Sequence, residues 1–374
     1  MSERDMENEK LNAGEPESET AAEAGQNENA QEEPQGESLF VCTANRGFAA
    51  YAQEELRRLF GSVKSSVLSD SEVLLVRLAM PEEEAVRRIA DSRPIFLRHI
   101  QPVGFEKEGD NTGALLADAA AYVLGDGRLG AGVKAALQVR RSEGTGEESA
   151  SQLRDWLEEL LRPSEAEFVA SGADWIVSVY LTPSGAYAGI SRPENNLSDW
   201  SGGAVRFRRE EGQLSRAKFK LLEAEREFGL DLSAYRSAVD IGAAPGGWTS
   251  LLLERGLKVT AVDPAKLHPS LLKAPNLTYI RKNAGEAKFS DNEFDLLVCD
   301  MSWSPKLMVQ LVTGLLHALA PGGTAIVTIK LMHKKPMALI KEVMASFESS
   351  RLQVQRAKQL FHNREEITLY MIKY

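Results

Sequence analysis

The feature that most constrains this chain is a glycine-rich segment after a short apolar run, Ala238-Val239-Asp240-Ile241-Gly242-Ala243-Ala244-Pro245-Gly246-Gly247-Trp248. Three glycines lie within six positions, with a proline among them. Glycine loses much conformational entropy on folding, so this composition is expected where the backbone must turn tightly. The run before this turn predicts a strand, and the run from Trp248 to Leu253 predicts a helix. A strand, a tight turn and a helix in this order let backbone approach a nucleotide-like ligand, although a merely structural turn shows the same local pattern.

The negative charge of the chain is concentrated in its first 38 residues. These residues hold twelve acidic and two basic side chains, so the rest of the chain keeps 42 of each sign (54 less 12 acidic, 44 less 2 basic). The segment has almost no large apolar residue, and we expect residues 1–38 to be a disordered acidic tail. Because the remainder is balanced, the net charge of −10 does not exclude a nucleic-acid partner.

Composition also bears on the compartment and on metals. No apolar run approaches the roughly 18 residues that span a bilayer, and no charged-then-apolar signal stands at the N-terminus, so we expect a cytoplasmic protein without membrane contact. Cys42 and Cys299 lie far apart in apolar runs, which argues against a disulfide framework or a cysteine zinc site. The five histidines are scattered, and we expect no metal.

Patterns of apolar residues divide the rest of the chain into four parts. Residues 39–104 read as strand-helix-strand-strand-helix-strand, the ferredoxin-like order, with its last strand at Ile95–Val103. Residues 105–191 form a second α+β region, and 192–213 a linker with several glycines, prolines and asparagines. Residues 214–374 alternate strands and helices, which predicts an α/β fold with a mostly parallel sheet and a terminal antiparallel hairpin, Leu352–Leu360 with Ile367–Ile372.

Polar residues mark the strand ends of this α/β domain. Asp263, Asp300 and Lys330 each follow an apolar strand, and ligands of open parallel sheets bind beyond the carboxyl ends of the strands. An acid about twenty residues after the glycine turn suits a ribose diol, so Asp263 indicates an adenosine-type ligand. NAD is disfavoured, because the turn is not Gly-x-Gly-x-x-Gly and the terminal hairpin departs from a dinucleotide fold. Lys220 lies beside the buried stripe of the helix from Leu214 to Phe228, from which it can lean over a neighbouring site.

Several segments together resemble one family. The glycine turn, Ser215-Arg216-Ala217-Lys218-Phe219-Lys220-Leu221, Cys299-Asp300-Met301, Ile329-Lys330-Leu331 and Arg364-Glu365-Glu366-Ile367-Thr368-Leu369 are similar to the FtsJ-type ribose 2′-O-methyltransferases, in particular to members that act on large-subunit ribosomal RNA. The resemblance implies a Rossmann-like S-adenosylmethionine-dependent domain, preceded by ferredoxin-like and THUMP-like RNA-binding regions. It also implies a catalytic Lys-Asp-Lys-Glu tetrad at Lys220, Asp300, Lys330 and Glu366.

The chemistry of ribose methylation gives these four residues roles. A ribose hydroxyl must lose its proton as the methyl group leaves the sulfonium, so a base must lie within hydrogen-bond reach. Lys330 is the expected base, because partial burial and a second cation can lower a lysine pKa from about 10.4. Lys220 is that second cation and orients the hydroxyl, while Asp300 and Glu366 hold the ammonium groups. Four such groups titrate as a cluster.

The cofactor, S-adenosylmethionine, is expected along the turn. Gly242 to Gly247 should line its methionine and ribose side, Asp263 its ribose diol, and Asn283 its adenine, although the family generally has Asp at that last position. The complete set of expected cofactor-binding residues is Ser215, Gly242, Ala243, Ala244, Pro245, Gly246, Gly247, Trp248, Asp263, Asn283 and Asp300.

Other methylation chemistries fit less well. Attack on cytosine C5 needs a nucleophilic cysteine, but Cys299 should point away from Asp300 and pack in the strand. Amino-group methylation typically follows Asp or Asn with two prolines, which Asp300-Met301-Ser302-Trp303 lacks. Trp303 suits either stacking of a target base or packing under its loop.

The sequence therefore predicts an RNA ribose 2′-O-methyltransferase acting on ribosomal RNA. Two basic segments, Arg140-Arg141 and Arg206-Phe207-Arg208-Arg209, suit either RNA contacts or solvated surface. The acidic tail is either a solvating extension or an acidic mimic that competes with RNA. The alternatives in function are a non-catalytic RNA-binding or assembly factor and a methyltransferase of small molecules. The sequence leaves open the target nucleotide, the choice between naked RNA and a particle, and the oligomeric state.

Overall fold

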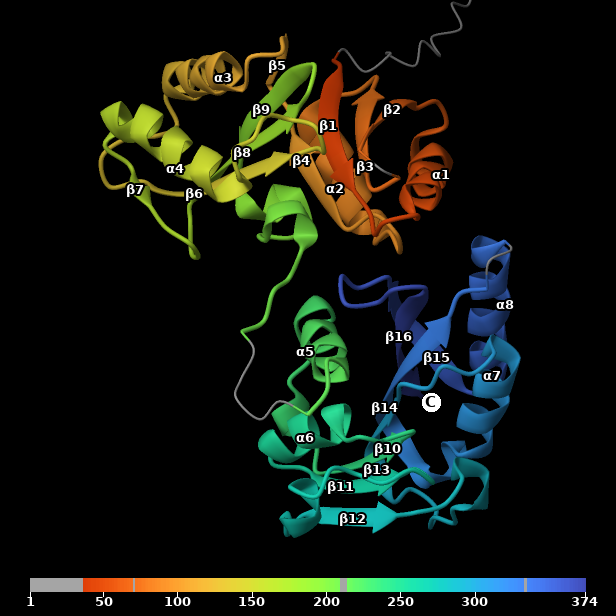
Figure 1. The fold of residues 1–374 in the computed structure, drawn as a ribbon. Coiled ribbons are helices and arrows are strands. Elements are labelled where there is room, and N and C mark those ends of the chain that lie inside the picture. Colours follow the sequence, from red (N-terminus) through yellow and green to blue (C-terminus); the bar gives the residue numbers. More distant parts are fainter. Residues whose placement is uncertain (1–35, 70, 209–213, 333–334) are drawn as a thin grey trace, which may run out of the picture. The chain divides into compact units, whose positions relative to one another are not determined.

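The computed structural model describes residues 36–69, 71–208, 214–332 and 335–374 (Figure 1). Most of the predicted acidic tail and Arg209 lie outside these residues. In the described parts of the chain, every helix is too short or too polar to cross a bilayer.

The first region is a four-stranded antiparallel sheet with two helices, and its element order confirms the ferredoxin-like prediction. The strands lie in the order β2-β3-β1-β4. The elements are β1 (Ser38–Thr43), α1 (Ala49–Phe60), β2 (Lys64–Ser69), β3 (Val73–Leu78), α2 (Glu82–Ser92) and β4 (His99–Pro102).

Strand β4 is shorter than predicted. It begins at His99 rather than at Ile95. The carboxylate of Glu55 on α1 accepts hydrogen bonds from the backbone N–H groups of Ile95, Phe96 and Leu97, at 2.7, 2.9 and 3.2 Å. These N–H groups are therefore satisfied by a side chain rather than by a neighbouring strand.

The second region is also α+β, as predicted. Its sheet has the order β5-β9-β8-β6-β7, with short edge strands β5 and β7 that the apolar pattern did not indicate. Residues 192–203, predicted as linker, instead form two 3-10 turns, η2 (Pro193–Asn196) and η3 (Ser201–Gly203), with Asn196 fully buried. The other elements are β5 (Phe105–Glu108), α3 (Thr112–Asp126), β6 (Lys134–Arg141), α4 (Ala150–Leu161), η1 (Arg162–Ser164), β7 (Glu167–Phe168), β8 (Trp175–Thr182) and β9 (Gly185–Ser191).

The C-terminal domain has the predicted mostly parallel sheet with a terminal antiparallel hairpin. Its order is β12-β11-β10-β13-β14-β16-β15, so β16 lies between β14 and β15 and the sheet departs from the dinucleotide-binding order. The elements are α5 (Ala217–Glu227), η4 (Leu232–Ala234), β10 (Ser237–Ile241), α6 (Gly247–Glu254), β11 (Lys258–Val262), η5 (Leu271–Lys273), β12 (Leu277–Ile280), η6 (Ala284–Glu286), β13 (Phe294–Cys299), α7 (Pro305–Gly314), η7 (Leu316–Ala318), β14 (Leu319–Lys330), α8 (Pro336–Ser349), β15 (Leu352–Lys358) and β16 (Glu366–Lys373).

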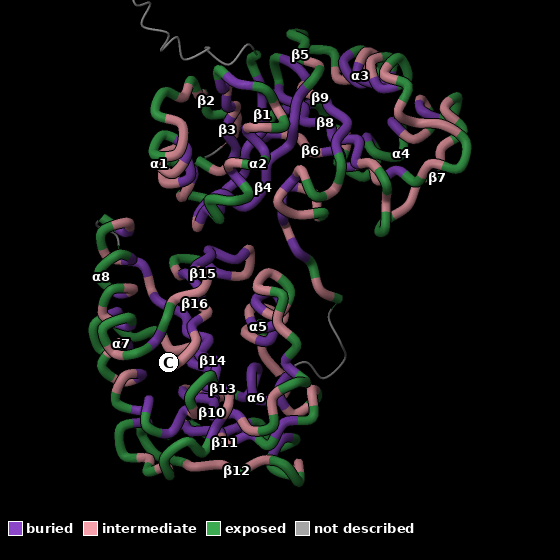
Figure 2. Tube along the Cα trace, turned by 180° about the vertical axis from the view of Figure 1, so that it is seen from behind, coloured by how far each residue is buried: buried purple, intermediate pink, exposed green. Residues whose placement is uncertain are grey.

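The central strands of this sheet are buried on both faces. Helices α5 and α6 cover one face, and α7 and α8 cover the other (Figure 1). Strands β10 and β13, and β14 from Gly323 to Ile329, are accordingly almost entirely buried, whereas the edge strand β12 is partly exposed (Figure 2). Two covered faces explain why these strands read as continuous apolar runs rather than as alternating ones.

The turn between β10 and α6 requires glycine at two positions. Gly242 and Gly246 have φ angles of 78° and 116°, in the region that residues other than glycine rarely adopt. A Cβ atom at Gly242 would lie 2.2 Å from Met301 Cγ, and one at Gly246 would lie 2.1 Å from Leu271 Cδ1. Both backbone angle and close packing therefore explain the glycines of this segment.

A buried carboxylate ties strand β10 to helix α6. Thr249 Oγ1 on α6 donates a 2.6 Å hydrogen bond to Asp240 Oδ2, and the Asp240 side chain is fully enclosed. Burial raises the pKa of Asp240 to about 7, although the hydrogen bond from Thr249 opposes this, and the nearby charges of Asp300 and Asp263 add to the rise.

The raised pKa of Asp240 predicts a pH-dependent stability. Because the folded-state pKa exceeds the unfolded value of about 3.9, the stabilising contribution of this carboxyl is complete below pH ~3.9 and is lost as the pH rises to about 7. Asp240→Asn keeps an acceptor for Thr249 and removes the titration. The unfolding temperature of Asp240→Asn, minus that of the unchanged protein, should therefore increase as the pH rises from about 4 to about 8, as measured by thermal denaturation.

The exposed Asp291 provides the matched control. Asp291→Asn should follow the unchanged protein across the same pH range. A difference between Asp240→Asn and the unchanged protein that is flat with pH, or that shrinks as pH rises, contradicts the role assigned to this carboxyl.

Candidate active site

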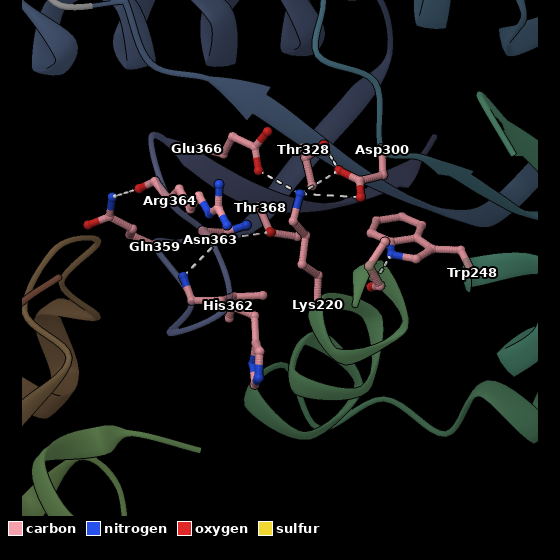
Figure 3. A network of polar contacts seen from close by, with 12 residues as sticks. Lys220, Trp248, Asp300, Thr328, Gln359, His362, Asn363, Arg364, Glu366 and Thr368 are labelled. Atoms are coloured by element: carbon pink, nitrogen blue, oxygen red, sulfur yellow. Dashed lines mark hydrogen bonds and ion pairs between the residues drawn. The ribbon is translucent and has the colours of Figure 1, made fainter. Parts of the chain in front are cut away.

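Three of the four predicted catalytic residues meet in one cluster (Figure 3). The ammonium group of Lys220 donates to Glu366 Oε2 at 2.6 Å and to the two carboxylate oxygens of Asp300 at 2.9 and 3.3 Å. The side chains of Lys220, Asp300 and Glu366 are 17, 14 and 15% exposed, respectively. One lysine thus joins two carboxylates in a largely enclosed site.

The fourth predicted residue, Lys330, lies opposite Glu366 in the sheet. The two residues are cross-strand partners in the antiparallel pair of β14 and β16. Directly opposite residues project to the same face with Cβ atoms about 5 Å apart. Within the described ranges, Lys330 lies beside the cluster without a direct hydrogen bond from its ammonium group to the other three side chains.

Lys220 is held as a cation. Burial alone would lower the pKa of Lys220, but the charges of Asp300 and Glu366 and their hydrogen bonds outweigh that effect and raise it. Lys220 therefore carries its proton at neutral pH. This is the state in which its ammonium group can donate a hydrogen bond that orients an oxygen.

Two close contacts place Lys220 over the sheet. The indole N–H of Trp248 on α6 donates to the carbonyl of Ala217 at the start of α5, at 2.8 Å. A Cβ atom at Gly247 would lie 3.0 Å from Ser215 Cβ and 3.1 Å from the Lys218 nitrogen. The small residue at 247 thus lets α5 approach the glycine turn, and the tryptophan fixes the helix there.

Thr328 is a member of the cluster that sequence reasoning missed. Its hydroxyl donates to Asp300 Oδ1 at 2.7 Å. Thr328 precedes Lys330 by two positions on β14, so both side chains point to the same face of the sheet. Alternation along this strand was the signal that could have identified Thr328 from the sequence.

Glu223 is a second missed residue and holds the loop before Glu366. Its carboxylate accepts from the backbone N–H groups of Phe361 and His362, at 2.7 and 2.9 Å, and lies 2.6 Å from His362 Nδ1. The side chain is almost fully buried. Glu223 is one turn of helix beyond Lys220, so α5 contributes both the central cation and the anchor of the loop that leads to Glu366.

The predicted cofactor residues Asp263 and Ala244 lie in contact. Asp263 Oδ2 accepts from the Ala244 N–H at 3.0 Å, and its Oδ1 accepts from the Ala265 N–H at 2.7 Å. The carboxylate at the end of β11 therefore braces the glycine turn that begins at the end of β10. Each carboxylate oxygen keeps a further lone pair that can accept a ligand hydroxyl.

Three other predicted cofactor residues are engaged with protein groups. Trp248 is buried with its N–H bonded to α5, as described above. Ser215 Oγ accepts from the Ala217 N–H at 3.1 Å. Asn283 is exposed, and its amide donates to Glu286 Oε1 at 3.1 Å. Cofactor contacts of these three residues stay predictions, and Trp248 has a structural role in addition.

The residues considered for other methylation chemistries and for RNA contacts differ in burial. Cys299 is fully buried, and burial raises the pKa of its thiol well above the ordinary value, which disfavours a thiolate nucleophile. Trp303 is 40% exposed. Phe207 stacks on Phe219 and His362 with ring centroids 5.6 Å away from each. In the part of the chain that the structure describes, no cluster of three or more His, Cys, Asp or Glu side chains is arranged to hold a metal.

Comparison with known proteins places similar sequences over the C-terminal domain. Residues 213–361 match the FtsJ-like methyltransferase family. Ribosomal RNA large subunit methyltransferase M from Halorhodospira halophila is 36% identical over 187 residues, which cover 49% of this chain and 53% of that protein. The protein of the same name from Alkalilimnicola ehrlichii is 33% identical over 229 residues, covering 58% and 62%. The aligned segments thus span between half and two thirds of these relatives.

Among solved structures, TrmN from Thermus thermophilus aligns with 90% of this chain and all of that one, at 16% identity and a TM-score of 0.37. A likeness this remote carries no conclusion. The match over residues 213–361 includes the glycine turn, Lys220, Asp300 and Lys330, and it confirms the predicted α/β methyltransferase fold and its S-adenosylmethionine dependence. The C-terminal domain of this chain is therefore similar, over residues 213–361, to the FtsJ-like methyltransferase family.

Proposed function

We propose that the protein transfers the methyl group of S-adenosylmethionine to a ribose 2′-hydroxyl of large-subunit ribosomal RNA. The observation that carries this proposal is the bridge from Lys220 to Asp300 and Glu366, with Lys330 opposite Glu366. Such a cluster of two lysines and two carboxylates suits deprotonation of a hydroxyl. It lies at the edge of the sheet that also carries the cofactor turn. The names of the relatives support ribosomal RNA as the substrate.

The transfer needs a base for the hydroxyl proton. The ribose oxygen forms a bond to the methyl carbon as the carbon–sulfur bond breaks, and the hydroxyl proton passes to Lys330 in its neutral form. S-adenosylhomocysteine and protonated Lys330 are the products, and Lys330 then returns its proton to solvent. Lys220 stays positively charged throughout and orients the acceptor oxygen.

The residues that follow β10 and β11, at the same edge of the sheet, would bind the cofactor. The turn from Gly242 to Gly247 lines the methionine and ribose of S-adenosylmethionine, and Asp263 accepts from the ribose hydroxyls while it braces Ala244. Asn283 lies at the start of η6, where its amide can face the adenine. The turn thereby presents the methyl group to the lysine and carboxylate cluster.

Loss of the base should abolish transfer without loss of the cofactor. Lys330→Ala should reduce methyl transfer to ribosomal RNA from cells that lack the protein about a hundredfold to ten-thousandfold, because general-base catalysis contributes ~10²–10⁴. Cofactor affinity, measured by calorimetry, should stay within about twofold.

Lys341 on α8 is exposed and provides the control, since Lys341→Ala removes a lysine outside the cluster. Normal transfer by Lys330→Ala would contradict the assignment of the base. Absence of transfer by the unchanged protein would instead favour a non-catalytic RNA-binding or assembly factor that keeps a methyltransferase fold.

The loop anchor gives a separate prediction. In Glu223→Gln, one side-chain oxygen replaces two acceptors, so one of the N–H groups of Phe361 and His362 loses its buried partner. Displacement of the loop before Glu366 should lower kcat about tenfold or more. KM for RNA and affinity for S-adenosylmethionine should hardly change, because Glu223 contacts neither ligand in the proposed arrangement.

Glu227→Gln is the matched control on the same helix, since among the described residues the ion-pair partner of Glu227 is Arg356, at 3.1 Å. Rates should be measured well below both unfolding temperatures, so that lost stability does not lower them. Equal kcat values for the two variants would show that Glu223 does not position the catalytic cluster.

A further inference from the structure

Two threonines face each other in the sheet beside the catalytic cluster. Thr328 on β14 and Thr368 on β16 are cross-strand partners, and Lys330 and Glu366 are the cross-strand partners two positions away. Residues two apart along a strand point to the same face of the sheet, and directly opposite residues share that face. Both threonines are almost fully buried. A pair of buried hydroxyl groups therefore lies on the face that carries the proposed base and one of the carboxylates.

The hydroxyl of Thr328 fixes the direction of the Asp300 carboxylate. Asp300 directly follows Cys299, the last residue of β13, so the ladder of that strand ends before it. Thr328 Oγ1 donates to Asp300 Oδ1 at 2.7 Å, and the Lys220 ammonium group donates to the same oxygen at 2.9 Å (Figure 3). A threonine side chain is stiff about χ1, which makes it a well-placed donor. The hydroxyl thus holds the oxygen that binds the central cation.

The hydroxyl of Thr368 acts on the loop that leads to the other carboxylate. Thr368 Oγ1 donates to Asn363 Oδ1 at 3.1 Å, and the same oxygen accepts from the Leu360 N–H at 2.8 Å. Asn363 is almost fully buried, and its backbone N–H donates to the Leu360 carbonyl at 3.0 Å. The turn 360–363 is therefore closed from within the sheet by Thr368, three residues before Glu366 begins β16.

We propose that Thr328 and Thr368 are positioning residues of the methyl transfer, Thr328 for Asp300 and Thr368 for the loop before Glu366. The inference rests on the proposed function, because it assigns both residues to the same reaction. Neither hydroxyl contacts substrate or cofactor in this arrangement. Together they keep the Lys220 ammonium group between the two carboxylates. Two of its N–H groups can serve the carboxylates, which leaves the third for the acceptor oxygen.

The test replaces each hydroxyl by a methyl group of nearly the same size. Thr328→Val and Thr368→Val keep a β-branched side chain that suits a strand, and thermal unfolding of the full chain checks that both variants fold. Each variant should lower kcat about tenfold or more, because small displacements of catalytic groups cost large factors in rate. KM for RNA should stay within about twofold, since uniform binding of the substrate is unchanged. Thr328→Ser keeps the donor and should recover kcat to within about threefold of the unchanged protein.

Thr324→Val is the matched control on the same strand. Thr324 is also almost fully buried, and its hydroxyl lies 2.8 Å from the Tyr235 hydroxyl, six positions before Lys330. This variant also loses a buried hydrogen bond, but its kcat should stay within about twofold because the site is distant from the cluster. Equal losses of kcat in Thr324→Val and Thr328→Val overturn the proposal. Unchanged kcat in either cluster variant overturns the role of that threonine.

The two threonines should also depend on each other. Both act through Lys220, so the double variant Thr328→Val with Thr368→Val should lose less in kcat than the product of the two single losses. Single losses that multiply would show two independent effects and would contradict a shared action on the central cation.

A crystal structure of Thr328→Val tests the geometry without activity. The Asp300 carboxylate should turn, and the 2.9 Å contact from the Lys220 ammonium group to Asp300 Oδ1 should lengthen, whereas Thr324→Val should keep it. An Asp300 side chain in its original position overturns the role of Thr328. Failure of the unchanged protein to transfer a methyl group would refute the proposed function, and this structural comparison would still decide whether Thr328 places Asp300. Transfer by the unchanged protein with Asp300 unmoved in Thr328→Val would refute only the role of Thr328.

Discussion

The contact on which the site depends is the ammonium group of Lys220 between the carboxylates of Asp300 and Glu366. It joins three elements, because the lysine lies on α5, Asp300 directly follows β13 and Glu366 begins β16. With side chains mostly enclosed, Coulomb energies exceed those in water several-fold. Loss of the lysine would remove the cation that bridges the two carboxylates. Breaking a buried ion pair in this way destabilises a protein by more than the intact pair stabilises it.

The cofactor turn and this ion cluster depend on the same packing. Gly247 lets α5 approach the turn, and Trp248 bonds to the first carbonyl of α5. Asp263 braces the turn from the neighbouring strand, while Glu223 on α5 anchors the loop before Glu366. The helix that carries the central lysine is therefore placed by the turn that would hold the methyl donor, and donor and acceptor sites share one support.

Local patterns predicted most of the fold, because apolar runs, glycine turns and strand-end polar residues are local properties. The family resemblance, rather than these local patterns, grouped Lys220, Asp300 and Glu366, whose side chains the structure places in contact. What the local patterns missed depends on tertiary contacts. The start of β4 is set by Glu55, which lies about forty positions away in the sequence. The turns in residues 192–203 form because these residues are buried against the N-terminal region of the chain. Glu223 reads as an ordinary surface glutamate of an amphipathic helix until its loop is in place.

The central claim is that these lysines and carboxylates serve transfer to a ribose oxygen. The most direct measurement is the position of the methyl group after the protein has acted on unmodified ribosomal RNA with isotopically labelled S-adenosylmethionine. Digestion to nucleosides and mass spectrometry of the sugar and base fragments separate the two possibilities. The account predicts label on the ribose fragment alone, and label on a base would contradict it.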